Sequence, residues 1–123
     1  MASTELQAIV RFRFHEGDVE AFKSLSAHCM DIVRTKDTGT LQYDTYFNDD
    51  ETECIVIERF RDSEALIQHG ENLAHLMDAI IATGSVFGEL LGEPSAELRA
   101  RFTGDGPVQL FTPWATLVPR YST

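Results

Sequence analysis

The chain has 123 residues, 43% of them hydrophobic, which is the size and composition of one globular domain with a single core. Its 20 acidic and 10 basic side chains give a net charge of -10, which repels phosphate backbones and anionic lipids, so we expect neither nucleic-acid nor membrane binding. No stretch approaches the ~20 apolar residues of a membrane span, and the start lacks the features of a secretory signal, so we expect a cytoplasmic protein.

The first half of the chain predicts a strand, a helix and a hairpin. Hydrophobic and polar residues alternate over residues 5–15, and only a strand can present such a pattern on one face. Apolar residues then recur at three- and four-residue steps to about Lys36, as in an amphipathic helix, and Gly39 follows its end. The β-rich runs 41–48 and 53–60, separated by a short polar turn, indicate an antiparallel hairpin.

The second half predicts a long helix and two weaker strands. Asp62 is placed to cap the helix, which we expect to be interrupted and kinked at Gly70. A strand follows over residues 86–92, and Pro94 suits the first turn of a short helical segment. Residues 107–114 predict a short fifth strand. The order β-α-β-β-α-β predicts an α+β, ferredoxin-like fold with both helices on one face of an antiparallel sheet.

The strands are apolar on both faces, and no further helix is long enough to cover the second face of the sheet. A second copy of the same sheet is the simplest cover, so we expect a homodimer. We also expect the fifth strand to be donated to the partner's sheet, which would protect an edge. We expect residues 1–112 to form a single domain and residues 113–123 to form a C-terminal tail. Trp114 either caps a neighbour's pocket or, as we prefer, anchors the fifth strand.

The two cysteines, Cys29 and Cys54, lie in apolar segments of different predicted elements and match no metal-binding spacing. Without a secretory signal, two thiols rarely form a disulfide framework, so we interpret them as reduced, buried and hydrophobic. A redox pair is the alternative, although neither thiol has a cationic neighbour in its own segment. The chain also lacks a phosphate-binding glycine loop, a GxSxG elbow and zinc spacing, so we expect no cofactor and no metal.

Two polar residues on otherwise apolar elements are candidates for chemistry. Glu58 shares a face with the hydrophobic residues of its strand, and His69 lies on the helix that follows. A buried carboxylate needs a partner or water, so Glu58 is either functional or forms a salt bridge with Arg11, Arg13 or Arg59. His69 is either a general base or a structural residue bonded to a backbone carbonyl.

These features resemble the antibiotic biosynthesis monooxygenase domain, a branch of the dimeric α/β-barrel proteins. The resemblance is carried by Gly39-x-x-x-Tyr43, by the strand and helix IVIERFRDSEALIQH with Glu58, Phe60, Asp62 and His69, and by the segment GEPSAELRARFTGDGP. It implies a dimer whose sheets form a barrel, with a pocket between sheet and helices in each subunit. Some such proteins oxidise polycyclic phenols or quinols with O2 and use no metal or flavin, and relatives degrade haem.

The resemblance implies that Glu58 and His69 line the pocket, with Tyr43, Tyr46 and Phe60 as aromatic walls. We therefore expect His69 and Glu58 to be catalytic, and Tyr43, Tyr46, Phe60 and Phe87 to bind the substrate. Tyr43 and Tyr46 have opposite parity, so only one can face the pocket unless a bulge intervenes. A phenolate can transfer an electron to O2, and a histidine with a reference pKa near ~6.5 can remove the phenolic proton. The prediction is a cofactor-independent monooxygenase acting on a small aromatic, phenolic or quinol molecule. One alternative is a non-catalytic barrel protein that binds a small molecule or responds to stress, and another is an isomerase or cyclase. A third alternative is an enzyme that degrades haem, which the anionic surface disfavours.

Overall fold

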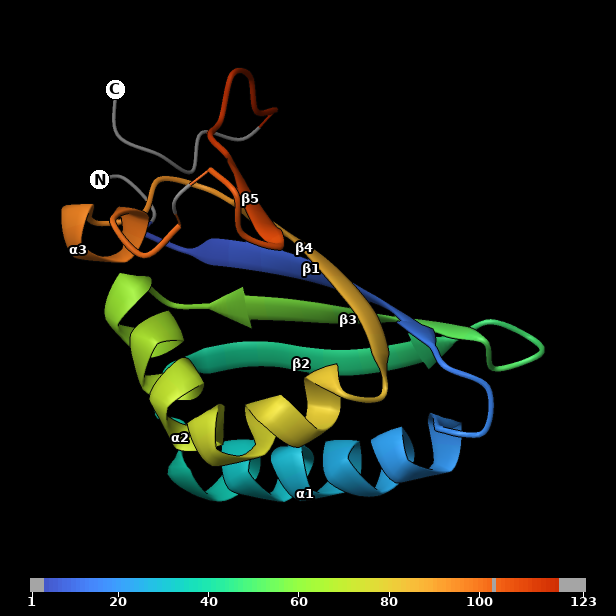
Figure 1. The fold of residues 1–123 in the computed structure, drawn as a ribbon. Coiled ribbons are helices and arrows are strands. Elements are labelled where there is room, and N and C mark those ends of the chain that lie inside the picture. Colours follow the sequence, from blue (N-terminus) through green and yellow to red (C-terminus); the bar gives the residue numbers. More distant parts are fainter. Residues whose placement is uncertain (1–3, 103, 118–123) are drawn as a thin grey trace.

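One five-stranded sheet carries two long helices on a single face (Figure 1). The structure is a computed structural model that describes residues 4–102 and 104–117. The elements are β1 (Leu6–Phe14), α1 (Val19–Lys36), β2 (Thr40–Phe47), β3 (Glu53–Phe60), α2 (Ser63–Ile81), β4 (Gly84–Leu91), α3 (Ala96–Arg99) and β5 (Val108–Phe111). The strand order is β2-β3-β1-β4-β5, with the first four strands antiparallel. The predicted ferredoxin-like α+β fold with an added C-terminal strand is confirmed.

The two long helices cover the sheet through apolar stripes at helical spacing. The residues that α1 buries are Phe22, Cys29, Ile32 and Val33. Helix α2 begins after Asp62, whose carboxylate accepts a hydrogen bond of 2.8 Å from the Ala65 amide, as predicted for a capping residue. The predicted interruption at Gly70 is wrong, because α2 runs unbroken through this exposed residue. The helix does change direction along its length, in agreement with the expected kink (Figure 1).

The core forms two clusters of side chains between the sheet and the helices. The larger cluster joins α1 to the middle of the sheet and to the second half of α2, and it contains Phe22, Cys29, Ile32, Val33, Cys54, Val56, Leu73 and Ile80. The smaller cluster joins the other end of the sheet to the start of α2 and to α3, and it contains Leu6, Ala8, Phe60, Ala65, Leu90 and Leu98. Both cysteines are free and buried, which agrees with their interpretation as small core residues.

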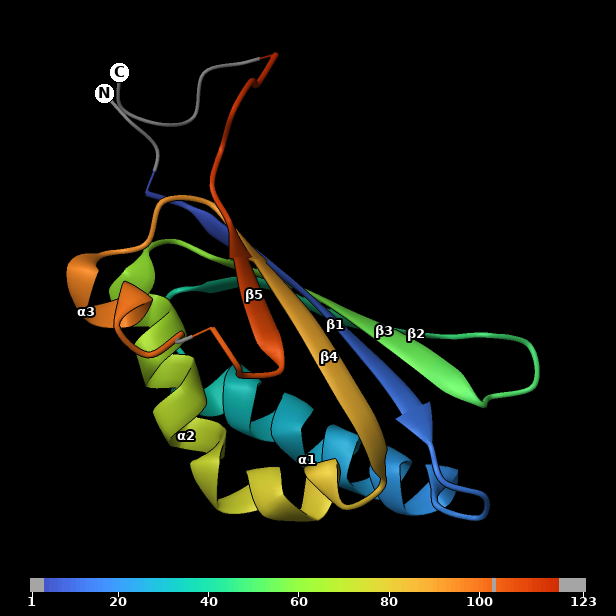
Figure 2. The same cartoon turned by 45° about the horizontal axis from the view of Figure 1, so that its top comes forward.

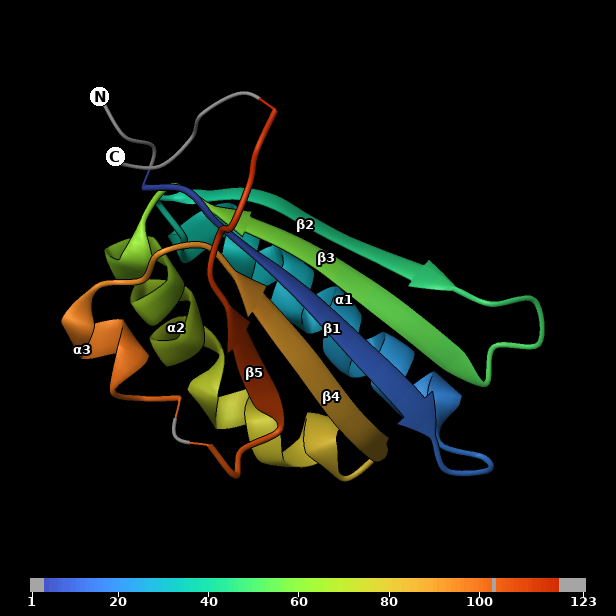
Figure 3. The same cartoon turned by 90° about the horizontal axis from the view of Figure 1, so that it is seen from above.

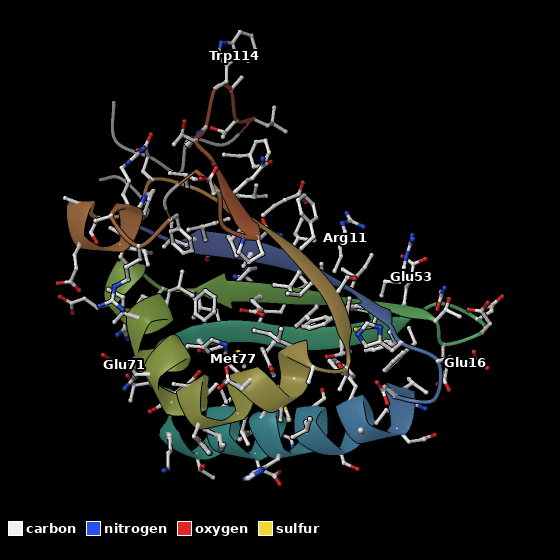
Figure 4. All side chains as sticks on the ribbon, viewed as in Figure 1. Arg11, Glu16, Glu53, Glu71, Met77 and Trp114 are labelled. Carbon is white, nitrogen blue, oxygen red and sulfur yellow. The ribbon has the colours of Figure 1, made fainter. Side chains whose placement is uncertain are left out.

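The fifth strand pairs within its own chain. Strand β5 lies parallel to β4, which Figure 2 shows as two adjacent ribbons, and its pairing with the sheet of a second copy stays a prediction. The connection through α3 carries the chain back along β4, so the two strands run in the same direction. Trp114 does not anchor β5, because its side chain is 98% exposed and projects away from the sheet (Figure 4).

The other face of the sheet has no helix over it, as the view from above shows (Figure 3). A row of neighbouring side chains crosses this face through strand pairing: Tyr46, Ile55, Arg11 and Phe87. Tyr46 is 56% exposed and Phe87 is 43% exposed, and Figure 4 shows Arg11 on the side away from the helices. This open face is therefore partly apolar, and the described residues place no helix over it. Among the described residues, no helix has both the length and the apolar character needed to cross a membrane.

Candidate active site

A cavity of about 410 Å³ lies between the helix-facing side of the sheet and the two long helices. Its walls are mostly aliphatic and aromatic side chains from both core clusters and from the segment before β5. The polar side chains in the lining are Ser26, Cys29, Tyr43, Glu58 and His69. A large apolar cavity with a few polar groups is the usual form of a small-molecule site.

His69 enters this lining from α2 as half of a buried pair with Asp37. Its Nδ1 lies 2.7 Å from Oδ2 of Asp37, and the two side chains are 8% and 1% exposed. A carboxylate accepts hydrogen bonds and cannot donate one, so Nδ1 carries the proton and the lone pair of a neutral His69 is on Nε2. Burial lowers the pKa of His69, although the hydrogen bond and the charge of Asp37 oppose this shift. His69 is therefore an uncharged base at neutral pH.

Asp37 is the residue after α1, and three side chains hold it in place. Besides His69, the Thr40 hydroxyl donates to Oδ2 at 2.7 Å and the Asn72 amide donates to Oδ1 at 2.8 Å. Burial opposes ionisation, but the hydrogen bonds from Asn72, Thr40 and His69 together lower the pKa of Asp37. Asp37 is thus a fixed carboxylate behind the imidazole, and it stabilises the ring orientation and any imidazolium that forms.

Gly39 allows the segment after α1 to approach α2 closely enough for this contact. A Cβ atom at Gly39 would lie 2.5 Å from Cβ of Ala65, one turn before His69 on the same helix. The backbone amide of Thr38 also donates to the side-chain carbonyl of Gln68, at 2.9 Å. The helical pattern predicted only that the first helix ends here. The structure shows that the close approach at Gly39 also positions Asp37 beside His69.

Glu58 faces the cavity from β3, on the other side of the imidazole. Its Oε1 lies 3.6 Å from Nε2 of His69, its side chain is 12% exposed, and no hydrogen bond to its carboxyl is found within the described residues. Burial, together with the negative charge of Asp37, raises the pKa of Glu58 to about 8. Glu58 is therefore mainly a neutral carboxylic acid at pH 7.

Tyr43 stands directly opposite Glu58 on the neighbouring strand β2. Its ring centroid lies 5.3 Å from that of His69, in an edge-to-face arrangement. Burial and the nearby Cys29 and Glu58 raise the pKa of Tyr43, so its hydroxyl stays protonated. Burial likewise raises the pKa of the Cys29 thiol, which makes it a poor nucleophile.

The six candidate residues fall into three groups. His69, Glu58 and Tyr43 line the cavity. Phe60 is fully buried beside the His69 ring, at a centroid distance of 5.0 Å, so it supports the base and does not line the cavity. Tyr46 and Phe87 lie on the open face, because their strand parity directs them away from the helices.

The structural alternatives for the two central residues do not match the geometry. The titratable side chain nearest to Glu58 is His69. Arg59 pairs with Glu5 at 3.1 Å, Arg13 lies 3.8 Å from Glu53, and Arg11 points to the open face of the sheet. His69 bonds a carboxylate and not a backbone carbonyl. Within the described residues, no group of three or more His, Cys, Asp and Glu side chains is arranged to hold a metal ion.

The family model described as Antibiotic biosynthesis monooxygenase matches residues 6–77, more than half of the chain. The chain belongs to the antibiotic biosynthesis monooxygenase family. The matched segment contains His69 and the described side chains that contact or position its imidazole: Asp37, Thr40, Tyr43, Glu58, Phe60 and Asn72. Strands β4 and β5 lie beyond it. A search of the curated proteins gives no match.

Solved structures share the fold of this monooxygenase-family chain. MupZ from Pseudomonas fluorescens has a TM-score of 0.75 and 22% identity, covering 96% of this chain and 91% of that one. Rv0793 from Mycobacterium tuberculosis has a TM-score of 0.65 and 22% identity, covering 74% and 96%. SnoaB from Streptomyces nogalater, a cofactor-independent oxygenase, has a TM-score of 0.62 and 17% identity, covering 84% and 95%. At these identities the likeness concerns the fold alone.

Proposed function

We propose that this family member is a cofactor-independent monooxygenase that oxidises a small phenolic or quinol molecule with O2. The observation that carries the proposal is the Asp37–His69 pair in the wall of an apolar cavity, at 2.7 Å. With Nδ1 bonded to Asp37, Nε2 of His69 is the nitrogen available as a base. It is therefore placed to accept the phenolic proton of a substrate bound in the cavity.

Proton removal is the step that such an enzyme must supply. A phenolate transfers an electron to O2 far more readily than the phenol does, and the two radicals then combine. The protein has to form the anion, stabilise the imidazolium that results and exclude water from the intermediates. Asp37 stabilises the imidazolium, and the apolar walls of the cavity limit the access of water. The shared fold with SnoaB, a cofactor-independent oxygenase, supports this proposal.

Oxygen consumption tests the proposed function directly. We expect the metal-stripped protein to consume O2 with at least one member of a panel of hydroquinones and anthrones. The substitution His69→Ala should reduce that rate by ~10²–10⁴-fold, the usual contribution of a general base. His28→Ala, at an exposed position on α1, serves as the matched control and should retain the rate. Equal rates in the wild type and His69→Ala would contradict the proposal.

We further propose that the protein is a homodimer in which the open faces of two sheets cover each other. The support is the row of exposed and half-buried side chains on this face, including Tyr46, Ile55 and Phe87. Light scattering should give about twice the chain mass of 13.8 kDa at micromolar concentrations. A mass of one chain across that range would refute the dimer.

A further inference from the structure

The arrangement of Glu58 and His69 is not explained by proton removal alone. A base that only accepts a phenolic proton needs Asp37 behind it, but it does not need a second carboxyl group in front of it. Yet Oε1 of Glu58 lies 3.6 Å from Nε2 of His69, beyond hydrogen-bond distance, and both atoms belong to residues that line the same cavity. The carboxyl group is thus left available to a bound molecule.

The surroundings of Glu58 keep its carboxyl in the protonated form. The titratable groups that face it are His69 on α2, Asp37 after α1, Tyr43 on β2 and Cys29 on α1. Asp37 is anionic and His69 is neutral, and no lysine or arginine is among the described residues that line the cavity. A negative charge on Glu58 would have no positive partner here, whereas a neutral carboxylic acid can donate a hydrogen bond or a proton.

We propose that Glu58 and His69 are an acid–base pair that interconverts the keto and enol forms of an uncharged ketone, a reaction that consumes no O2. Nε2 of His69 removes a proton from the carbon next to the carbonyl. The C–H electron pair becomes the new C=C bond, and the carbonyl π pair moves to oxygen, which takes the proton of Glu58. The products are a neutral enol, an imidazolium and a carboxylate, so atoms and charges balance.

The short distance between the two groups also allows a proton transfer that returns the site to its starting form after each turnover. Once the enol has formed, His69 carries the extra proton and Glu58 lacks one, and the two lie within 4 Å of each other. Transfer of the proton from Nε2 to the carboxylate returns both to their starting forms, directly or through one water. Asp37 stabilises the imidazolium in the interval.

The cavity also limits the class of ketone. The described part of its lining is apolar and carries no cationic side chain, which disfavours substrates with a carboxylate or phosphate group. Its volume of about 410 Å³ suits a fused-ring molecule of modest size. The proposal rests on the proposed function for the role of His69 as base. It deepens that function, because an enol is an electron-rich form that can react onward with O2.

Solvent deuterium exchange without O2 tests the inference. The probe is 2-tetralone, a neutral two-ring ketone with acidic hydrogens between its ring and carbonyl, incubated in D2O under argon and followed by NMR. We expect the wild type to exchange these hydrogens well above the buffer rate, and Glu58→Gln to lose ~10²–10⁴-fold of the enzymatic rate. Glu53→Gln, the same change on β3 but outside the cavity, should retain it.

The pH profile distinguishes an acid from a structural carboxyl. The enzymatic exchange rate of the wild type should fall above about pH 8 as Glu58 ionises, and the residual rate of Glu58→Gln should lack this decline. Circular dichroism establishes that each variant is folded. Exchange by folded Glu58→Gln at the wild-type rate, or no exchange above buffer by the wild type, would overturn the inference. O2 uptake with phenols but no exchange refutes only this inference, whereas exchange without any O2 uptake refutes only the proposed oxygenase.

Discussion

Replacement of His69 by alanine should weaken the fold as well as remove the proposed base. The buried Asp37 carboxylate would lose one of its three side-chain donors, and a hydrogen bond to a charged group contributes about 1.5–3 kcal/mol. The packing of the imidazole against Phe60 and Tyr43 would also be lost. Because Thr40 and the amide of Asn72 still satisfy Asp37, we expect a loss of about 2–4 kcal/mol, smaller than for a fully unpaired buried charge.

Urea unfolding at pH 7.5, followed by circular dichroism, measures this loss. Burial lowers the pKa of His69 below its ordinary 6.5, so the folded state favours the neutral ring. The contribution of His69 to stability is therefore complete above pH 6.5 and decreases as the pH falls below it, and the difference between wild type and His69→Ala should shrink at pH 5. In a double-mutant cycle, His69→Ala and Asp37→Asn should couple by more than about 1 kcal/mol.

His28→Ala again provides the control, since an exposed substitution should change the free energy of unfolding by less than about 0.5 kcal/mol. A similarly small effect of His69→Ala would show that the bond between His69 and Asp37 does not form in the folded protein. Additivity of the two substitutions in the double-mutant cycle would show the same thing through an independent measurement.

Packing and charge lead to three further predictions. Gly39→Ala should cost about 1–3 kcal/mol in urea unfolding and reduce turnover, because the new methyl group would push the chain away from Ala65; wild-type stability would contradict this. Glu58→Gln should be more stable than the wild type at pH 8.5 and similar at pH 4, since the raised pKa of Glu58 means that the wild type loses stability as the pH rises from 4.5 to about 8; a constant difference would exclude this. Trp114→Ala should change the free energy of unfolding by less than about 0.5 kcal/mol, because the side chain is 98% exposed; a larger loss in urea unfolding would contradict this.

Most of the fold was predictable because its signals are local. The alternation in residues 5–15 and the helical stripe ending near Lys36 each depend on neighbouring side chains that share a face. Asp62 caps its helix through a contact three residues away, which sequence can show. The pairing of β5 was not predictable in this way, since it depends on where the chain after β4 returns to the sheet.

The sequence by itself determined the elements, their order and two polar residues of the cavity lining, Glu58 and His69, which stand out on apolar elements. Only the tertiary structure decided which face of the sheet encloses the cavity, and therefore that Tyr43 lines it while Tyr46 does not. It also revealed Asp37, which is 32 residues from its partner His69. A carboxylate after a helix has no periodic signal, and its role arises only where two distant segments pack closely enough to exclude water.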